Sequence, residues 1–92
     1  METLTRAWAA EFGPSGVRVN AISPGVVHKP LPRQADPQPG DALMKGTPAG
    51  THGTPDAIAY AAVYLASDEA AFVHGAVIDV DGGRTGVAVL AA

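Results

Sequence analysis

The sequence predicts an α/β fold in which a helix followed by a strand occurs twice, with a long irregular loop between the two pairs. Apolar residues recur at helical spacing near the N-terminus and again after residue 54, and each stretch is followed by a short segment of alternating apolar residues. Between the two pairs, prolines and glycines are frequent and large apolar residues are few. We expect residues 1–92 to form a single partial domain.

The first pair is a helix at residues 1–12 and a strand at residues 17–22. Gly13 and Pro14 end the helix, and the turn residues that follow lead directly into the strand. Because this turn is brief, the pair is typical of the second half of a helix-to-parallel-strand unit. Four residues share one face of the helix: Leu4, Ala7, Trp8 and Glu11.

Residues 28–53 are expected to form a lid-like loop. We expect no core in this segment, because it is rich in proline and glycine. A short helical turn is possible near residues 41–45, with Asp41 as its cap. A loop of this length in a compact domain is usually a lid or is disordered.

The second pair is a helix at residues 55–67 and a strand at residues 76–81. Thr54 is the expected N-cap, Pro55 occupies the first helical position and Asp56 lies in the first turn. The strand stops at the glycines that follow residue 81. Connection rules place the two predicted strands parallel and adjacent.

Composition excludes several classes of function. The 92 residues carry six basic side chains and a net charge of −3, which gives no footprint for nucleic acid or for an anionic membrane. There is no cysteine, so neither disulfides nor thiolate metal sites can form. No apolar run approaches the ~20 residues that span a bilayer, and the N-terminus does not resemble a signal peptide. We expect a cytoplasmic protein.

The histidines predict no metal site. His28, His52 and His74 lie far apart in the sequence, and none has a second ligand at i+3 or i+4, so we interpret all three as loop residues. Asn20 lies in the first predicted strand. Because a buried amide needs partners, we expect its side chain to bridge neighbouring backbone groups.

Two further pairs have a structural and a chemical interpretation. Tyr60 and Tyr64 lie one turn apart on a helix, and without a lysine or serine at useful spacing they indicate core or interface aromatics rather than a general acid. Asp79 and Asp81 share one face of a strand and could form a carboxylate dyad. A solvated edge or a turn cap before the following glycines is the favoured interpretation.

The segment from Ser23 to Val27 is the main candidate site. It follows a predicted parallel strand, and ligands bind at the carboxyl ends of the strands in open α/β sheets. A glycine at this point allows a close approach of the main chain. The alternative is an ordinary strand-ending turn with no ligand.

Two blocks of sequence, residues 11–27 and 53–83, resemble the C-terminal third of the short-chain dehydrogenases/reductases. The resemblance implies a C-terminal fragment of a Rossmann-like doubly wound parallel sheet. It also implies that the loop after the first strand holds the nicotinamide end of NAD or NADP, with Pro24, Gly25 and Val27 as cofactor-binding residues. The family usually has a threonine two residues beyond Val27, where this chain has Lys29, which cannot reproduce a short hydroxyl contact.

The catalytic motifs of that family are absent from the sequence. There is no glycine-rich dinucleotide fingerprint. Neither Lys29 nor Lys45 has a tyrosine four positions upstream, so no Tyr-x-x-x-Lys pair exists and we assign no catalytic residue. We therefore expect a truncated oxidoreductase that is inactive alone. The alternative is a non-catalytic binding or oligomerisation module that pairs with itself or with a complete homologue.

Overall fold

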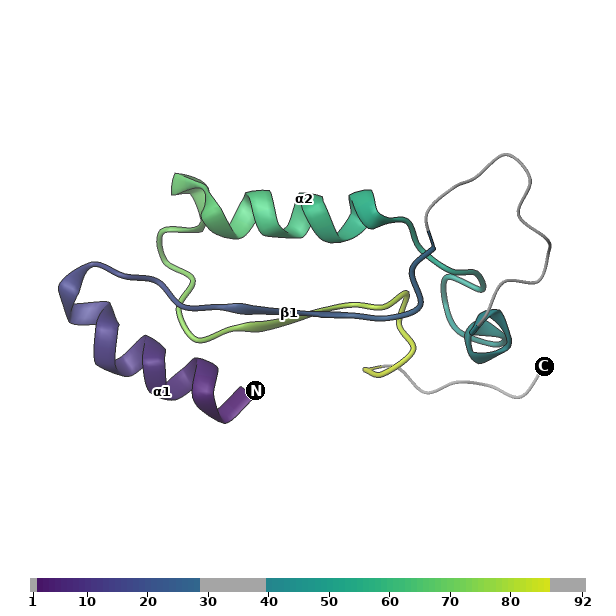
Figure 1. The fold of residues 1–92 in the computed structure, drawn as a ribbon, viewed down its shortest axis with the longest axis horizontal. Helices are drawn as coiled ribbons and strands as arrows, with labels where there is room; N and C mark the ends of the chain where they lie inside the picture. The colour runs from purple at the N-terminus through teal and green to yellow at the C-terminus, as the bar shows by residue number, and fades with distance from the viewer. Residues whose placement is uncertain (1, 29–39, 87–92) are drawn as a thin grey trace.

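The computed structural model describes residues 2–28 and 40–86, and its elements follow the predicted order (Figure 1). The helices and strands are α1 (Glu2–Phe12), β1 (Ala21–Pro24), α2 (Pro55–Ala66) and β2 (Val77–Val80). Three short 3-10 helices are η1 (Gly13–Ser15), η2 (Asp41–Met44) and η3 (Asp68–Ala70). In the described ranges, no helix is long and apolar enough to cross a membrane.

The two strands form a small parallel sheet. They pair in register from Ala21 with Val77 to Pro24 with Val80, which confirms the prediction of parallel neighbours. Figure 1 shows α2 running along one side of the strands and α1 lying on the other side. The α/β class and the Rossmann-like arrangement of the sheet are therefore as predicted.

The predicted bounds of the first strand, residues 17–22, are wrong. Pairing with β2 begins only at Ala21, whose N–H donates to the Ala76 carbonyl at 2.9 Å, and it continues to Pro24. Before that point the Gly75 N–H donates to the Val19 carbonyl at 2.9 Å, and the Asn20 side chain bridges the two segments. Its amide donates to the Val73 carbonyl at 3.0 Å and its oxygen accepts from the Ala76 N–H at 2.9 Å, which confirms the predicted bridging role.

Arg18 ties this same segment to the end of α2. Its guanidinium group donates to the carbonyl oxygens of Leu65, Ser67 and Ala70 at 2.7, 3.1 and 2.9 Å. The last carbonyls of a helix have no intrahelical partner and carry partial negative charge. One cation therefore satisfies three acceptors at the C-terminal end of α2 and in η3.

Of the lid-like loop, the structure describes residue 28 and residues 40–53, and the second stretch contains a buried side chain. Met44 in η2 is only 1% exposed, so the expectation that no core forms in this segment is wrong here. Hydrogen bonds also hold the turn that follows, because the Thr47 hydroxyl donates to the Met44 carbonyl and accepts from the Gly50 N–H. Asp41 is not the helix cap, because Gly40 occupies that position.

Two consecutive glycines after β2 allow this packing. Gly82 and Gly83 have φ angles of +68° and +89°, which residues with a side chain rarely adopt. A Cβ atom at Gly82 would lie 2.7 Å from that of Ala49, and one at Gly83 would lie 2.6 Å from Pro48. The Ala49 N–H donates to the Gly82 carbonyl at 3.1 Å, so the loop lies directly against the turn that ends β2.

Few apolar side chains are fully covered. Among the described residues, the buried hydrophobic ones are Ala9, Met44 and Ala70, and the side chains of β1 and β2 are half-buried or exposed. Parallel sheets in other proteins are normally covered on both faces. Large apolar side chains that remain exposed include Leu4, Trp8, Phe12, Tyr60, Val63, Tyr64 and Phe72.

Candidate functional site

The carboxyl ends of the two strands meet at one edge of the sheet, where the predicted loop lies. Gly25 follows β1 directly, and its N–H donates to the Val80 carbonyl at 3.1 Å. A Cβ atom at position 25 would lie 2.6 Å from the Asp81 Cβ and 2.7 Å from the Asp81 Cα. The neighbouring strand therefore requires glycine here, whether or not a ligand approaches the loop.

Asp81 caps the turn after β2. Its carboxylate accepts hydrogen bonds from the Thr85 hydroxyl, from the Gly83 N–H at 2.9 Å and from the Thr85 N–H at 3.1 Å. These bonds, above all the one from the Thr85 side chain, lower the pKa of Asp81 below its ordinary value of 3.8. The geometry confirms the turn-cap interpretation for Asp81, while Asp79 is exposed.

A cavity of about 180 Å³ lies beside these strand ends. Val26 and Val27 line it from the loop after β1, Met44 and His52 from the segment opposite, and Ala57 from α2. Gly25 packs against Asp81, and Pro24 is exposed at the end of β1. Of the three predicted cofactor-binding residues, only Val27 lines this cavity.

Val27 also has a distinctive backbone arrangement. It forms an isolated parallel bridge with Gly53, in which the Gly53 N–H donates to the Val26 carbonyl at 2.9 Å and the His28 N–H donates to the Gly53 carbonyl at 3.0 Å. In a parallel bridge of this kind, the N–H and C=O groups of the central residue point away from the partner. Those of Val27 therefore point away from Gly53.

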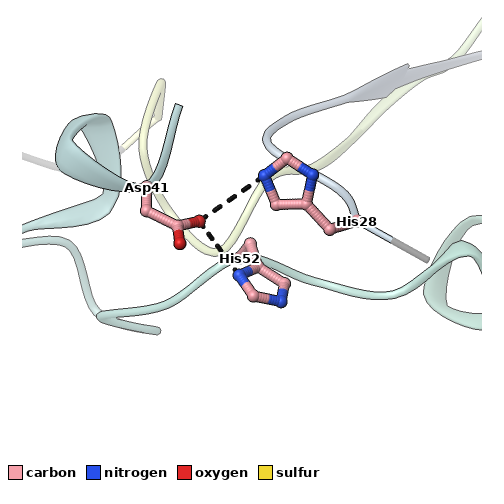
Figure 2. Close-up of side chains that lie close together, drawn as sticks. All are labelled: His28, Asp41 and His52. Carbon is pink, nitrogen blue, oxygen red and sulfur yellow. Dashed lines mark hydrogen bonds and ion pairs between the residues drawn. The ribbon is translucent and has the colours of Figure 1, made fainter. Parts of the chain in front are cut away.

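The bridge brings together two histidines that the sequence separates. His28 follows Val27 and His52 precedes Gly53, and their rings meet edge to face with centroids 4.8 Å apart. Both rings reach the Asp41 carboxylate (Figure 2). All three histidines lie in loops as predicted, but their spacing gave no sign that two of them meet, and the Asp41 contact was not foreseen. His74 lies beside Gly13, near the end of α1.

Comparison with known proteins identifies the family. The family model described as enoyl-(acyl carrier protein) reductase matches residues 1–85. The chain belongs to the short-chain dehydrogenase/reductase family. D-threitol dehydrogenase of Mycolicibacterium smegmatis is 52% identical over 83 residues, which are 89% of this chain and 32% of that protein.

Solved structures of this family show the same fold. A variant of the Serratia marcescens short-chain dehydrogenase/reductase superposes with a TM-score of 0.78 at 31% identity, covering 91% of this chain and 34% of that one. 4-Hydroxyisoleucine dehydrogenase in complex with NADH gives a TM-score of 0.74 at 35% identity, covering 91% and 34%. The chain thus spans about a third of the length of the relatives it matches.

The tyrosines of α2 do not form a catalytic site of the family type. Tyr60 is 72% exposed and Tyr64 is 46% exposed. The short-chain dehydrogenase/reductase motif needs a lysine four residues after its tyrosine, and position 64 is tyrosine while position 68 is aspartate. The predicted alternative of core aromatics is therefore wrong for both side chains, and the interface role stays a prediction. Lys29, the departure from the family pattern, lies outside the described residues.

Proposed function

We propose that this chain is the nicotinamide-end portion of an NAD- or NADP-dependent oxidoreductase that acts on an alcohol or carbonyl substrate. The observation that carries the proposal is the direction of the Val27 N–H and C=O groups, which point away from Gly53 at the strand ends. A carboxamide has one acceptor and two donor hydrogens, so a backbone N–H and C=O of one residue complement it. Val27 would hold the carboxamide of the nicotinamide ring in this way, with Pro24 and Gly25 shaping the turn.

The same proposal holds that the isolated chain does not transfer hydride. The cavity of about 180 Å³ is smaller than the roughly 300–1,000 Å³ of typical small-molecule sites, so it accommodates only one end of a dinucleotide. Hydride transfer to a carbonyl also needs a positioned acid, and the sequence contains no Tyr-x-x-x-Lys pair. Positioning of the reactants is worth about 7–11 kcal/mol of the barrier, which the chain alone does not supply.

A chimera tests the assignment of the loop. Residues 1–85 would replace the matching third of D-threitol dehydrogenase, to which they are similar in sequence. We expect the chimera to oxidise D-threitol. In the chimera, Val27→Pro removes the backbone N–H and should raise the KM for the cofactor at least tenfold, while Val27→Ala keeps the N–H and serves as the control. A folded chimera whose cofactor KM is the same in both variants would contradict the role of Val27.

A second candidate function is a non-catalytic module that pairs with itself or with a complete homologue. It is favoured by the apolar side chains on the outer surface of α2 and after η3. Val63 is 67% exposed, Tyr60 is 72% exposed and Phe72 is fully exposed. Soluble monomers rarely leave such apolar groups uncovered in contiguous patches.

Light scattering after size exclusion tests this second candidate. We expect the 92-residue chain to form dimers or larger assemblies. The double substitution Tyr60→Gln with Val63→Gln should weaken association at least tenfold, and Glu69→Gln, at an exposed polar site, should leave it unchanged. A monodisperse monomer with a single sharp unfolding transition would rule out self-association as the function of this surface.

A further inference from the structure

We propose that His28, Asp41 and His52 form a three-ligand site for a divalent transition-metal ion, with Zn²⁺ as the ion. Figure 2 shows both imidazole rings directed at one carboxylate oxygen. The His52 Nδ1 atom lies 3.0 Å from the Asp41 Oδ1 atom, and the His28 Nε2 atom lies 3.5 Å from the same oxygen. One ligand atom from each residue lies within 4.8 Å of the other two. This site is independent of the proposed hydride chemistry.

These distances are close to those of a metal centre. Ligand atoms about 2.0–2.1 Å from a tetrahedral Zn²⁺ ion are about 3.4 Å apart. The two pairs that include Asp41 are already near this separation, at 3.0 and 3.5 Å. The two imidazole nitrogens lie at most 4.8 Å apart, so only a small rotation of the rings is needed to bring three ligands onto one ion.

The backbone holds the three ligands in place. The bridge between Val27 and Gly53 fixes His28 and His52 on adjoining segments, each one residue from a bridged position. The start of η2 is placed by Gly40, where a Cβ atom would lie 3.3 Å from the Val26 side chain. The ligands are therefore set by backbone pairing and packing, which fix their positions before an ion arrives.

Burial and ligand chemistry favour Zn²⁺. The side chains of His28, Asp41 and His52 are 19%, 18% and 29% exposed, so they are sheltered but an ion can reach them. Imidazole nitrogens suit Zn²⁺, Cu²⁺ and Ni²⁺, and one carboxylate completes the His₂-carboxylate set found in zinc enzymes, with a fourth position left for water. Mg²⁺ and Ca²⁺ prefer oxygen ligands and should bind poorly.

Such an ion would join three segments that are distant in the sequence. It would connect the loop after β1 with η2 and with the residues before α2, and His52 also lines the cavity at the strand ends. Binding should therefore stabilise the folded state and fix the segment of residues 40–53 over those strand ends.

Titration of the tag-free, metal-free 92-residue chain with Zn²⁺, and with Co²⁺ as a coloured substitute, tests the proposal. We expect one ion per chain, a visible Co²⁺ spectrum of tetrahedral type and a rise in the thermal midpoint with Zn²⁺. His28→Gln, Asp41→Asn and His52→Gln should each lower the affinity at least tenfold. His74→Gln is the matched control, because this histidine lies near the end of α1, and it should leave the affinity unchanged.

Two results would overturn the site. One is the absence of stoichiometric Zn²⁺ or Co²⁺ binding by the unsubstituted chain. The other is an equal loss of affinity in His74→Gln and His28→Gln, which would show non-specific binding by histidine. Circular dichroism of each variant with and without Zn²⁺ separates loss of the site from loss of folding. The proposal requires that a ligand variant with unchanged secondary structure binds the ion more weakly than the unsubstituted chain.

Discussion

Substitution of Gly25 by alanine should strongly destabilise the chain. The new Cβ atom would lie 2.6 Å from the Asp81 Cβ and 2.7 Å from the Asp81 Cα, whereas ordinary contacts begin at 3.4 Å. The strand ends must then separate by about 0.8 Å, because one of the contacted atoms belongs to the backbone. This movement also weakens the hydrogen bond from the Gly25 N–H to the Val80 carbonyl, now 3.1 Å long.

We estimate the loss at about 1.5–4.5 kcal/mol, since overpacking costs about 1–3 kcal/mol and a weakened hydrogen bond adds about 0.5–1.5 kcal/mol. Urea unfolding followed by far-UV circular dichroism, at one fixed protein concentration, measures it. Gly13→Ala is the control, because a Cβ atom there meets only the His74 ring at 3.8 Å. Equal unfolding midpoints for the two variants would refute the conclusion that the neighbouring strand, rather than a ligand, requires glycine at position 25.

Two other predictions concern polar groups. Arg18→Lys should lower the free energy of unfolding by about 1.5–3 kcal/mol, because an ammonium group cannot reach all three carbonyls that the guanidinium group now satisfies. Urea unfolding measures this loss. The control Arg84→Lys, at an exposed site, should leave the free energy of unfolding almost unchanged. Because the folded pKa of Asp81 is lowered, its contribution to stability is complete above pH 3.8 and is lost as the pH falls through that lowered value. Asp81→Asn should reduce this part of the acid dependence in thermal unfolding between neutral and acid pH, and an unchanged dependence would contradict the turn-cap role.

The regular elements were predictable because their signals are local. The start of α2 is marked by Pro55 at its first position, and the end of α1 by Gly13. Thr54 is the N-cap as predicted, although its side chain makes no capping hydrogen bond. The parallel pairing of β1 and β2 followed from connection rules together with the family pattern, and the Asn20 bridge from the need to satisfy a partly buried amide.

The contacts that build the candidate sites were not predictable from local patterns. Arg18 binds carbonyls that lie 47 to 52 residues away, and no periodicity in the sequence relates the two segments. His28 and His52 meet because the Val27–Gly53 bridge brings together two segments that lie far apart in the sequence. Met44 is buried beside Gly82, where a Cβ atom would lie 2.9 Å from the Met44 side chain, and composition alone does not reveal this contact.

The most direct test of the proposed function is the oxidation or reduction of nicotinamide by the purified 92-residue chain. The chain, prepared free of any complete homologue, would be assayed by absorbance with NAD, NADP and their reduced forms, and with D-threitol and other alcohol and carbonyl substrates. D-threitol dehydrogenase, to which the chain is similar in sequence, serves as the positive control. We predict no turnover above the enzyme-free blank. Turnover that is proportional to chain concentration would show that an acid and a cofactor site are present within these residues, and would contradict the proposal that the isolated chain does not transfer hydride.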